Sequence, residues 1–216
     1  MQPGRQPASV RVWVGRWWRG EAAPFWRRAV DLALAPAELL FRGVVAARDI
    51  GYRRGLLRSR AAPVPVVSIG NLTVGGAGKT PITAWAVDLL RSWGCRPAIV
   101  LRGYGADEVE VHRELNPGVP VVVAPRRWEG AMRAAAAGAD CVVVDDGFQH
   151  RALRRDLDIV LVSAEHWRGN RRMLPRGPWR EPIAALARGD RIVVTRKTAS
   201  EAEAAAVAAE IADLGF

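Results

Sequence analysis

Short apolar runs alternate with amphipathic stretches from residue 61 to the end of the chain. Valine and isoleucine dominate the runs, and continuous runs of this kind are typical of parallel strands that are covered on both faces. The sequence therefore predicts strands over 63–70, 96–102, 119–125, 140–146, 157–163 and 190–196. Helical spacing closed by glycine predicts helices over 81–93, 129–137 and 200–214. This alternation indicates a doubly wound α/β fold.

An earlier stretch, 24–58, has apolar residues at roughly helical spacing. Pro36 lies inside it, and an interior proline removes a helical hydrogen bond and clashes with the preceding turn. We therefore expect two helices that meet at Pro36.

The net charge of +10 is concentrated in this first part, because residues 1–60 contain twelve arginines and four acidic residues. Trp13, Trp17, Trp18 and Trp26 lie in the same region. Arginine and tryptophan beside an apolar face are typical of a helix that lies on an anionic bilayer. Two alternatives remain: the apolar stripe packs on the protein core, or the charge binds nucleic acid. Because no nucleic-acid motif accompanies the charge, we expect a membrane surface and no nucleic acid.

Composition narrows the class of protein. A chain of 216 residues that is half apolar can bury a sizeable core. Cys95 and Cys141 are too few and too far apart in the sequence for a disulfide framework or a CxxC metal site. The sequence contains no apolar run of about 20 residues and no secretory signal core. We expect a basic, Trp-rich helical segment over 1–60, one α/β domain over 61–216, and a location on the cytosolic side.

The segment SIGNLTVGGAGKTP, residues 68–81, places a glycine-rich turn between a strand and a helix. Gly78, Lys79 and Thr80 match the end of the phosphate-binding loop pattern, whereas Thr73 stands where its first glycine would be. Backbone amides at a helix N-terminus would hold phosphates, Lys79 would reach the β and γ groups, and Thr80 would bind Mg²⁺. A glycine turn without a ligand is the alternative.

A second segment, CVVVDDGFQH, brings Asp145 and Asp146 to the carboxyl edge of the predicted sheet, where ligands of open α/β sheets bind. Two adjacent carboxylates repel each other unless a cation such as Mg²⁺ offsets them; the alternative is an aspartate that caps the next segment. His150 follows closely and fits a structural role as well as a catalytic one. Guanine specificity is not indicated, because VVTRKTAS lacks an Asn-Lys-x-Asp segment.

Four segments occur in the order PVVSIGNLTVGGAGKTP, LRGYG, VVVDDGFQHRALRRDLDIVLV and GNRRMLPRGPWREP. Together they resemble the tetraacyldisaccharide 4'-kinase family, the lipid A kinases of Gram-negative bacteria. The resemblance implies a P-loop NTPase-like, mostly parallel sheet, ATP and Mg²⁺ as cofactors, and phosphorylation of the 4' hydroxyl of an acylated glucosamine disaccharide. It also implies peripheral attachment to the cytoplasmic side of the inner membrane through the N-terminal helices.

The resemblance also assigns residues. The nucleotide loop would consist of Thr73, Val74, Gly75, Gly76, Ala77, Gly78, Lys79 and Thr80. Asp145 and Asp146 would serve the metal and the reaction centre. Further family positions that line the site are Gln149, His150 and Arg180. Glu181 would be one of the metal ligands, and either Arg126 or Arg127 would contact phosphate.

Two features depart from the family. Its proposed base lies in a Gly-Asp-Glu-Pro segment, which survives here as Ala106, Asp107, Glu108 and Val109, so Asp107 is the candidate base on a shortened loop. Relatives also continue for about another third of a chain and form a second lobe, which we expect to be absent here. The alternatives are an ATP-binding module without turnover and a membrane-surface module.

Overall fold

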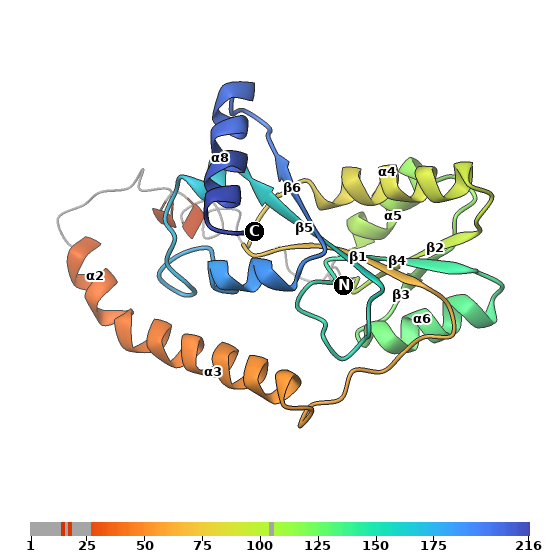
Figure 1. The fold of residues 1–216 in the computed structure, drawn as a ribbon, viewed down its shortest axis with the longest axis horizontal. Coiled ribbons are helices and arrows are strands. Elements are labelled where there is room, and N and C mark those ends of the chain that lie inside the picture. Colours follow the sequence, from red (N-terminus) through yellow and green to blue (C-terminus); the bar gives the residue numbers. More distant parts are fainter. Residues whose placement is uncertain (1–13, 16, 19–26, 104–105) are drawn as a thin grey trace, which may run out of the picture.

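The computed structural model describes residues 14–15, 17–18, 27–103 and 106–216. Its centre is a parallel sheet of six strands in the order β3-β2-β4-β1-β5-β6 (Figure 1). The strands are β1 (Val66–Asn71), β2 (Pro97–Leu101), β3 (Val121–Val123), β4 (Cys141–Asp145), β5 (Leu157–Ser163) and β6 (Arg191–Thr195). The chain enters at β1 in the middle of the sheet and crosses over to both sides, so the sheet is doubly wound as predicted.

Alternate residues of each strand face opposite layers. On one face, α4 (Lys79–Ser92) and α5 (Ala106–Leu115) cover a cluster that includes Val87, Ile99 and Val143. On the other, α6 (Arg127–Ala136) packs its alanines against Val142 and Val144. The helices therefore cover both faces of the strands, which explains their continuous apolar sequences.

A third group of elements covers the β5 and β6 side of the sheet. These elements are α7 (Ala164–Trp167), the 3₁₀ helix η1 (Ile183–Arg188) and α8 (Glu201–Asp213). Val162, Trp167, Leu186 and Ile211 form a shared core there. Ser200 and Glu203 form a capping box that starts α8, so this helix begins where its sequence predicts.

Two helices precede the sheet, α2 (Arg27–Ala33) and α3 (Ala35–Arg53), and Pro36 lies in the first turn of α3. The predicted division at Pro36 is confirmed, because a proline is tolerated in the first turn but not further inside a helix. Val45 packs on the core beside β5, whereas Leu39, Leu40 and Val44 remain exposed. Thus α3 has one packed face and one apolar face open to solvent.

The tryptophans expected at a membrane interface divide into two groups. Trp13 and Trp26 lie outside the described residues. Trp17 is only 4% exposed, and the Trp18 indole Nε1 donates a hydrogen bond to the Pro175 carbonyl oxygen at 3.2 Å. Both side chains therefore contact the protein, Trp18 through the segment that contains Pro175.

The predicted strands and three predicted helices are present, with shifts of up to three residues at their ends. One prediction about a connection was wrong. Asp107 lies in the first turn of α5 and not on a loop, and its side chain is exposed. A helix forms there because Val109 packs on the core beside α4, and His112, three residues further along and therefore on the same face, is buried.

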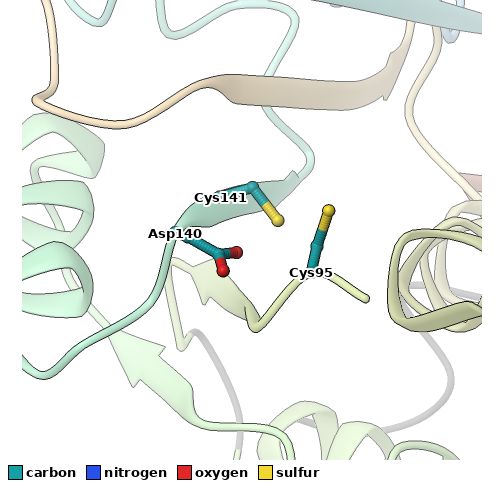
Figure 2. A group of neighbouring side chains, drawn as sticks. All are labelled: Cys95, Asp140 and Cys141. Carbon is teal, nitrogen blue, oxygen red and sulfur yellow. The ribbon is translucent and has the colours of Figure 1, made fainter. Parts of the chain in front are cut away.

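Both cysteines lie at the edge of the sheet that the amino ends of β2 and β4 form. Cys95, Asp140 and Cys141 lie together there although they are far apart in the sequence (Figure 2). Among the described helices, none combines the length and the apolar character needed to cross a bilayer.

Candidate nucleotide site

The carboxyl ends of the central strands open into a cavity of about 620 Å³. This volume lies in the range of small-molecule sites. The loop before α4, Asp145 at the end of β4 and Asp146 after it line the cavity, together with residues at and after the ends of β2, β5 and β6. Its lining includes Gly76, Ala77, Gly78, Lys79, Thr80, Glu108, Arg127, Asp145, Asp146, Glu165 and Lys197. The sequence prediction that the phosphate loop and both aspartates meet at one edge is therefore confirmed as geometry.

The glycine-rich loop is shaped to receive an anion. Gly78 has φ 76°, a left-handed conformation that favours glycine, and it begins α4. The first-turn N–H groups of a helix lack partners inside the helix and carry the positive end of its dipole. The loop is held from outside, because Val74 N donates to Pro178 O at 2.7 Å and Thr195 Oγ1 donates to Ala77 O at 3.0 Å. A phosphate group would meet a preorganised set of donors.

Asn71, the last residue of β1, is buried and forms hydrogen bonds to three candidate site residues, which the sequence did not predict. Its side-chain oxygen accepts hydrogen bonds from Lys79 Nζ at 3.2 Å and from Arg180 at 2.6 Å. Its main-chain oxygen accepts from Gln149 Nε2 at 2.9 Å. Asn71 therefore fixes Lys79, Gln149 and Arg180 around one point, although Gln149 and Arg180 do not themselves line the main cavity.

Asp146 has a backbone conformation that is unusual for a residue with a side chain, with φ 55°. Its carboxylate accepts two hydrogen bonds from Arg180, at 2.9 and 3.0 Å, and lies 3.6 Å from Lys79 Nζ. Burial alone raises its pKa, but the Arg180 and Lys79 charges outweigh burial and lower the pKa to about 2. Asp146 is therefore an anion at neutral pH.

Asp145 is held by a residue that sequence reasoning missed. His112, on α5 and 1% exposed, lies with Nε2 2.8 Å from Asp145 Oδ2. The other oxygen, Oδ1, is buried and has no hydrogen-bond partner among the described residues. An oriented carboxylate with one open oxygen, beside the Thr80 that lines the same cavity, fits a Mg²⁺ ion.

The structure distinguishes between Arg126 and Arg127, the two candidates for a phosphate contact. Arg127 is buried and lines the cavity, whereas Arg126 is exposed and pairs with Glu129 at 2.9 Å. Burial lowers the pKa of Arg127 to about 10, so it stays charged at neutral pH. Because α6 begins at Arg127, the two neighbouring side chains leave in different directions. The structure thus brings Arg127, not Arg126, to the other cavity residues.

His150 lies outside the main cavity, in an adjoining pocket with Arg58, Arg60 and Trp128. Burial, followed by the nearby Arg127 charge, lowers the pKa of His150 to about 4. Its imidazole is therefore neutral at physiological pH, and it can accept or donate a hydrogen bond there.

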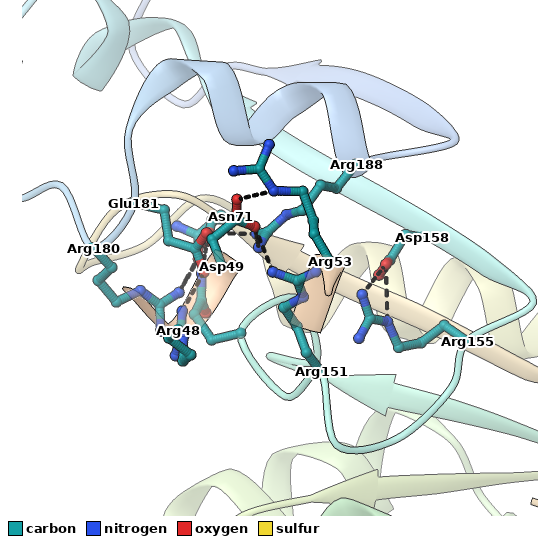
Figure 3. Close-up of polar contacts among 11 residues, drawn as sticks. Arg48, Asp49, Arg53, Asn71, Arg151, Arg155, Asp158, Arg180, Glu181 and Arg188 are labelled. Atoms are coloured by element: carbon teal, nitrogen blue, oxygen red, sulfur yellow. Dashed lines mark hydrogen bonds and ion pairs between the residues drawn. The ribbon is translucent and has the colours of Figure 1, made fainter. Parts of the chain in front are cut away.

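Glu181 does not join the metal-ligand candidates. It is 1% exposed, and its two oxygens pair with Arg48 of α3 at 2.8 Å and Arg188 of η1 at 2.5 Å (Figure 3). Both oxygens are occupied, and the side chain borders a separate pocket between α3 and η1. Its proposed place among the metal ligands is therefore not supported by this arrangement, because the two guanidinium groups already neutralise the carboxylate.

The far wall of the cavity is held by Glu165, another residue that the sequence analysis missed. Its Oε1 accepts hydrogen bonds from the backbone N–H groups of Lys197, Thr198 and Ala199, at 2.6 to 3.0 Å. Burial raises its pKa, but these bonds and one from Ser163 outweigh burial and hold the pKa far below its ordinary value. The loop after β6 is thereby fixed with Arg196 and Lys197 facing the cavity.

The candidate base Asp107 and its neighbour Glu108 differ in their position relative to the cavity. Glu108 lines the cavity, whereas its neighbour Asp107 does not. Because successive residues of a helix point about 100° apart, one residue of the pair faces the cavity when the other faces solvent.

Comparison with known proteins gives consistent matches. The sequence model of the family described as Tetraacyldisaccharide-1-P 4'-kinase matches residues 30–118 and 107–214. The chain is 39% identical over 210 residues to the tetraacyldisaccharide 4'-kinase of Chlorobium luteolum, covering 85% of this chain and 59% of that protein. It is 44% identical over 190 residues to the protein of the same name from Halorhodospira halophila, covering 79% and 58%.

A crystal structure of LpxK from Aquifex aeolicus in complex with ATP is similar in fold, with a TM-score of 0.72 and 33% identity. The match covers 77% of this chain and 59% of that one. The chain therefore spans less than two thirds of the length of these relatives.

Proposed function

Because this chain belongs to the tetraacyldisaccharide-1-P 4'-kinase family, we propose that it transfers the γ-phosphate of ATP to the 4' hydroxyl of an acylated glucosamine disaccharide, a step of lipid A synthesis. One observation carries the proposal: the phosphate loop and the two aspartates at the end of β4 line the same cavity. A cation-binding carboxylate opposite a phosphate loop is the arrangement that phosphoryl transfer requires.

In this proposal the loop residues 73–80 hold the phosphates of ATP, and Lys79 donates to the β and γ groups. Lys79 is at present paired with Asn71 and Asp146, so incoming phosphate oxygens exchange one set of acceptors for another. Arg127 supplies a second positive charge to the same cavity. These charges stabilise the negative charge that spreads over the transferred group.

Thr80 and Asp145 are the proposed ligands of Mg²⁺, which when bound neutralises charge between the β and γ phosphates. His112 orients Asp145 from behind. Asp146, with Arg180 fixed on its carboxylate, is the proposed residue nearest the reaction centre. Asp107 remains the proposed proton acceptor by family resemblance, and Glu108 is the second candidate because it lines the cavity.

The acceptor would approach from a lipid surface. Arg42 is exposed near the exposed apolar residues Leu39 and Leu40, and Arg53 and Arg54 are exposed at the far end of α3. A helix with exposed leucines and arginines suits peripheral attachment to an anionic membrane, and we place the protein on the cytoplasmic side of the inner membrane in this proposal.

The test measures nucleotide binding and transfer separately. Titration calorimetry of Mg-ATP should give tight binding for the natural chain and roughly 10- to 100-fold weaker binding for Lys79→Ala, since a hydrogen bond to a charged group contributes about 1.5–3 kcal/mol. The matched control is Arg91→Ala, which removes an exposed cation from the other end of α4 and should bind normally. Equal affinity of the natural chain and Lys79→Ala would remove the loop from the site.

Transfer is measured with γ-labelled ATP and a tetraacyldisaccharide acceptor, with a full-length relative as the positive control for the acceptor. Label in the lipid that disappears in Asp146→Ala supports the kinase, and comparison of Asp107→Asn with Glu108→Gln identifies the proton acceptor. Binding without transfer would favour an ATP-binding module, and vesicle binding without ATP binding would favour a membrane-surface module.

A further inference from the structure

Two thiols and one carboxylate gather at the edge of the sheet opposite the nucleotide cavity (Figure 2). Cys95 precedes β2, and Asp140 and Cys141 lie at the start of β4. The two strands are parallel neighbours, and Pro97 of β2 stands beside Cys141 of β4. The ligand atoms of the three side chains all lie within 4.8 Å of one another.

The backbone holds these residues in place before any ion binds. Both α4 and α6 end in a turn closed by a glycine, Gly94 after α4 and Gly138 after α6. The Cys95 N–H donates to Leu90 O at 3.1 Å, and the equivalent N–H after α6, that of Ala139, donates to Ala134 O at 3.1 Å. Each helix end is thus closed in the same way, which fixes Cys95 and the residues next to Asp140.

The two turns are also tied to each other. Asp140 N donates to Arg96 O at 3.1 Å, and Arg96 N donates to Asp140 Oδ1 at 2.7 Å. This reciprocal pair sets the distance between the turns and orients the Asp140 carboxylate. Oδ1 accepts this one hydrogen bond and Oδ2 lies 3.4 Å from Arg96 Nε, so each oxygen, with two lone pairs, can still bind a cation.

The chemistry of the group fits a zinc ion. Zn²⁺ binds thiolate sulfur at about 2.3 Å and carboxylate oxygen at about 2.0–2.2 Å in tetrahedral geometry, which places two thiolates roughly 3.8 Å apart. Ligand atoms within 4.8 Å need only small side-chain movements to reach these distances. Cys141 is buried, Cys95 is half-buried and the Asp140 side chain is 41% exposed, so the fourth position opens to water.

We propose that Cys95, Asp140 and Cys141 form a Zn²⁺ site with water as the fourth ligand, a site separate from the proposed kinase chemistry. Its ligands come from the turns that follow α4 and α6, and the site lies at the amino ends of the strands whose carboxyl ends line the nucleotide cavity. Bound zinc links the two turns and stabilises β2 against β4, because an ion that binds only the folded chain shifts the equilibrium towards it.

The experiment uses the 216-residue chain, reduced and freed of metal with a chelator, and needs no nucleotide. Co²⁺ replaces Zn²⁺ as a visible probe, and thiolate coordination produces a near-ultraviolet charge-transfer band. One equivalent of Co²⁺ should saturate this band and one equivalent of Zn²⁺ should abolish it. Zn²⁺ should also raise the melting temperature of the natural chain.

The variants divide the site by ligand. Cys95→Ser and Cys141→Ala should each lose the band and weaken Zn²⁺ binding about 100-fold or more, since even residues that only support a ligand change metal affinity 10- to 100-fold. Asp140→Asn keeps an oxygen for Arg96 and should weaken binding at least about tenfold. The matched control is Asp88→Asn, an exposed carboxylate on α4 that should leave Zn²⁺ binding unchanged.

Circular dichroism confirms that each variant is folded, and Asp140→Asn, at an exposed position, keeps the test decisive if a cysteine variant unfolds. The proposal is overturned if the natural chain shows no charge-transfer band, or if the band survives in a folded cysteine variant. It is also overturned if the two cysteines form a disulfide that persists under reducing conditions, because no thiolate is then available to the ion.

Discussion

His112 reaches from α5 to Asp145 and occupies one of the two carboxylate oxygens at 2.8 Å. The other oxygen remains buried without a partner among the described residues. A carboxylate fixed in this way offers one oriented oxygen to a cation. If Asp145 binds Mg²⁺ as proposed, His112 is a positioning residue for that ligand.

Replacing His112 should weaken the binding of Mg²⁺ more than the binding of ATP. His112→Ala frees Asp145 to rotate, and loss of a residue that orients a metal ligand lowers metal affinity about 10- to 100-fold. The measurement is the Mg²⁺ concentration that half-saturates nucleotide binding, followed by calorimetry. Val111→Ala, an exposed neighbour on the same helix, is the control. An unchanged Mg²⁺ midpoint in a folded His112→Ala protein would contradict the assignment.

At this scale the sequence revealed residues that lie inside recognisable local patterns. Lys79 and Thr80 begin the helix after β1, and Asp145 and Asp146 lie at the end of β4, so strand polarity alone predicts their shared edge. Asn71, His112 and Glu165 could not be found in this way, because their partners lie in distant segments. Residue spacing in the sequence does not indicate that His112 of α5 contacts Asp145 of β4.

Whole elements also shape the cavity, and the loop after β6 shows how. Its backbone N–H groups at Lys197, Thr198 and Ala199 all point to one carboxylate, that of Glu165. The loop is therefore ordered by a single side chain that belongs to α7. Its position sets where Arg196 and Lys197 stand along the cavity wall.

Removing that carboxylate should release the loop. In Glu165→Ala the three N–H groups lose an ionised acceptor, and bonds to charged groups contribute about 1.5–3 kcal/mol each when buried, less at this partly exposed site. Amide hydrogen exchange over 197–199 should accelerate about tenfold or more, and ATP binding should weaken. Glu201→Ala, exposed in the first turn of α8, should change neither. Unaltered exchange in 197–199 would show that other contacts hold the loop.

The elements themselves were largely predictable, since buried parallel strands have sequences of continuous β-branched residues. Helix α5 escaped prediction because its sequence, ADEVEVHREL, is mostly charged and lacks a clear cap. Its few apolar residues are explained by the packing of α5 against α4 and β3, which the sequence alone does not show. The close approach of Cys95 to Cys141 escaped for a similar reason, because the strand order that joins β2 to β4 is a property of the whole sheet.

Viewed as a whole, the molecule has an apolar strip on one outer side. Leu32 of α2 and Leu39, Leu40 and Val44 of α3 are each more than half exposed, and these helices lie along the side opposite α4 (Figure 1). Exposed apolar groups of this extent indicate an interaction surface. The neighbouring arginines favour an anionic one.

The chain should therefore float with anionic vesicles, and high salt should weaken the binding because it screens the arginines. Leu39→Ser with Leu40→Ser should reduce binding at least about tenfold, since burying one leucine contributes about 1.5–3 kcal/mol. Trp85→Ser on α4, which removes an exposed aromatic ring from the other side of the molecule, is the control. Equal flotation with neutral and anionic vesicles would favour an alternative role for these residues in packing.

Arg180 and Glu181 are consecutive, yet they serve different parts of the molecule. Arg180 pairs with Asp146 in the nucleotide site, and Glu181 pairs with Arg48 of α3 (Figure 3). Under the proposed function, a lipid surface that bound α3 and a nucleotide that bound beside Asp146 would contact groups held by two consecutive residues. Thermodynamic linkage then requires reciprocity: whatever factor the membrane applies to ATP affinity, ATP applies to membrane affinity. Measuring either affinity in the presence of the other ligand gives that factor, and a value above one would mean that the chain binds ATP more tightly on a membrane than away from it.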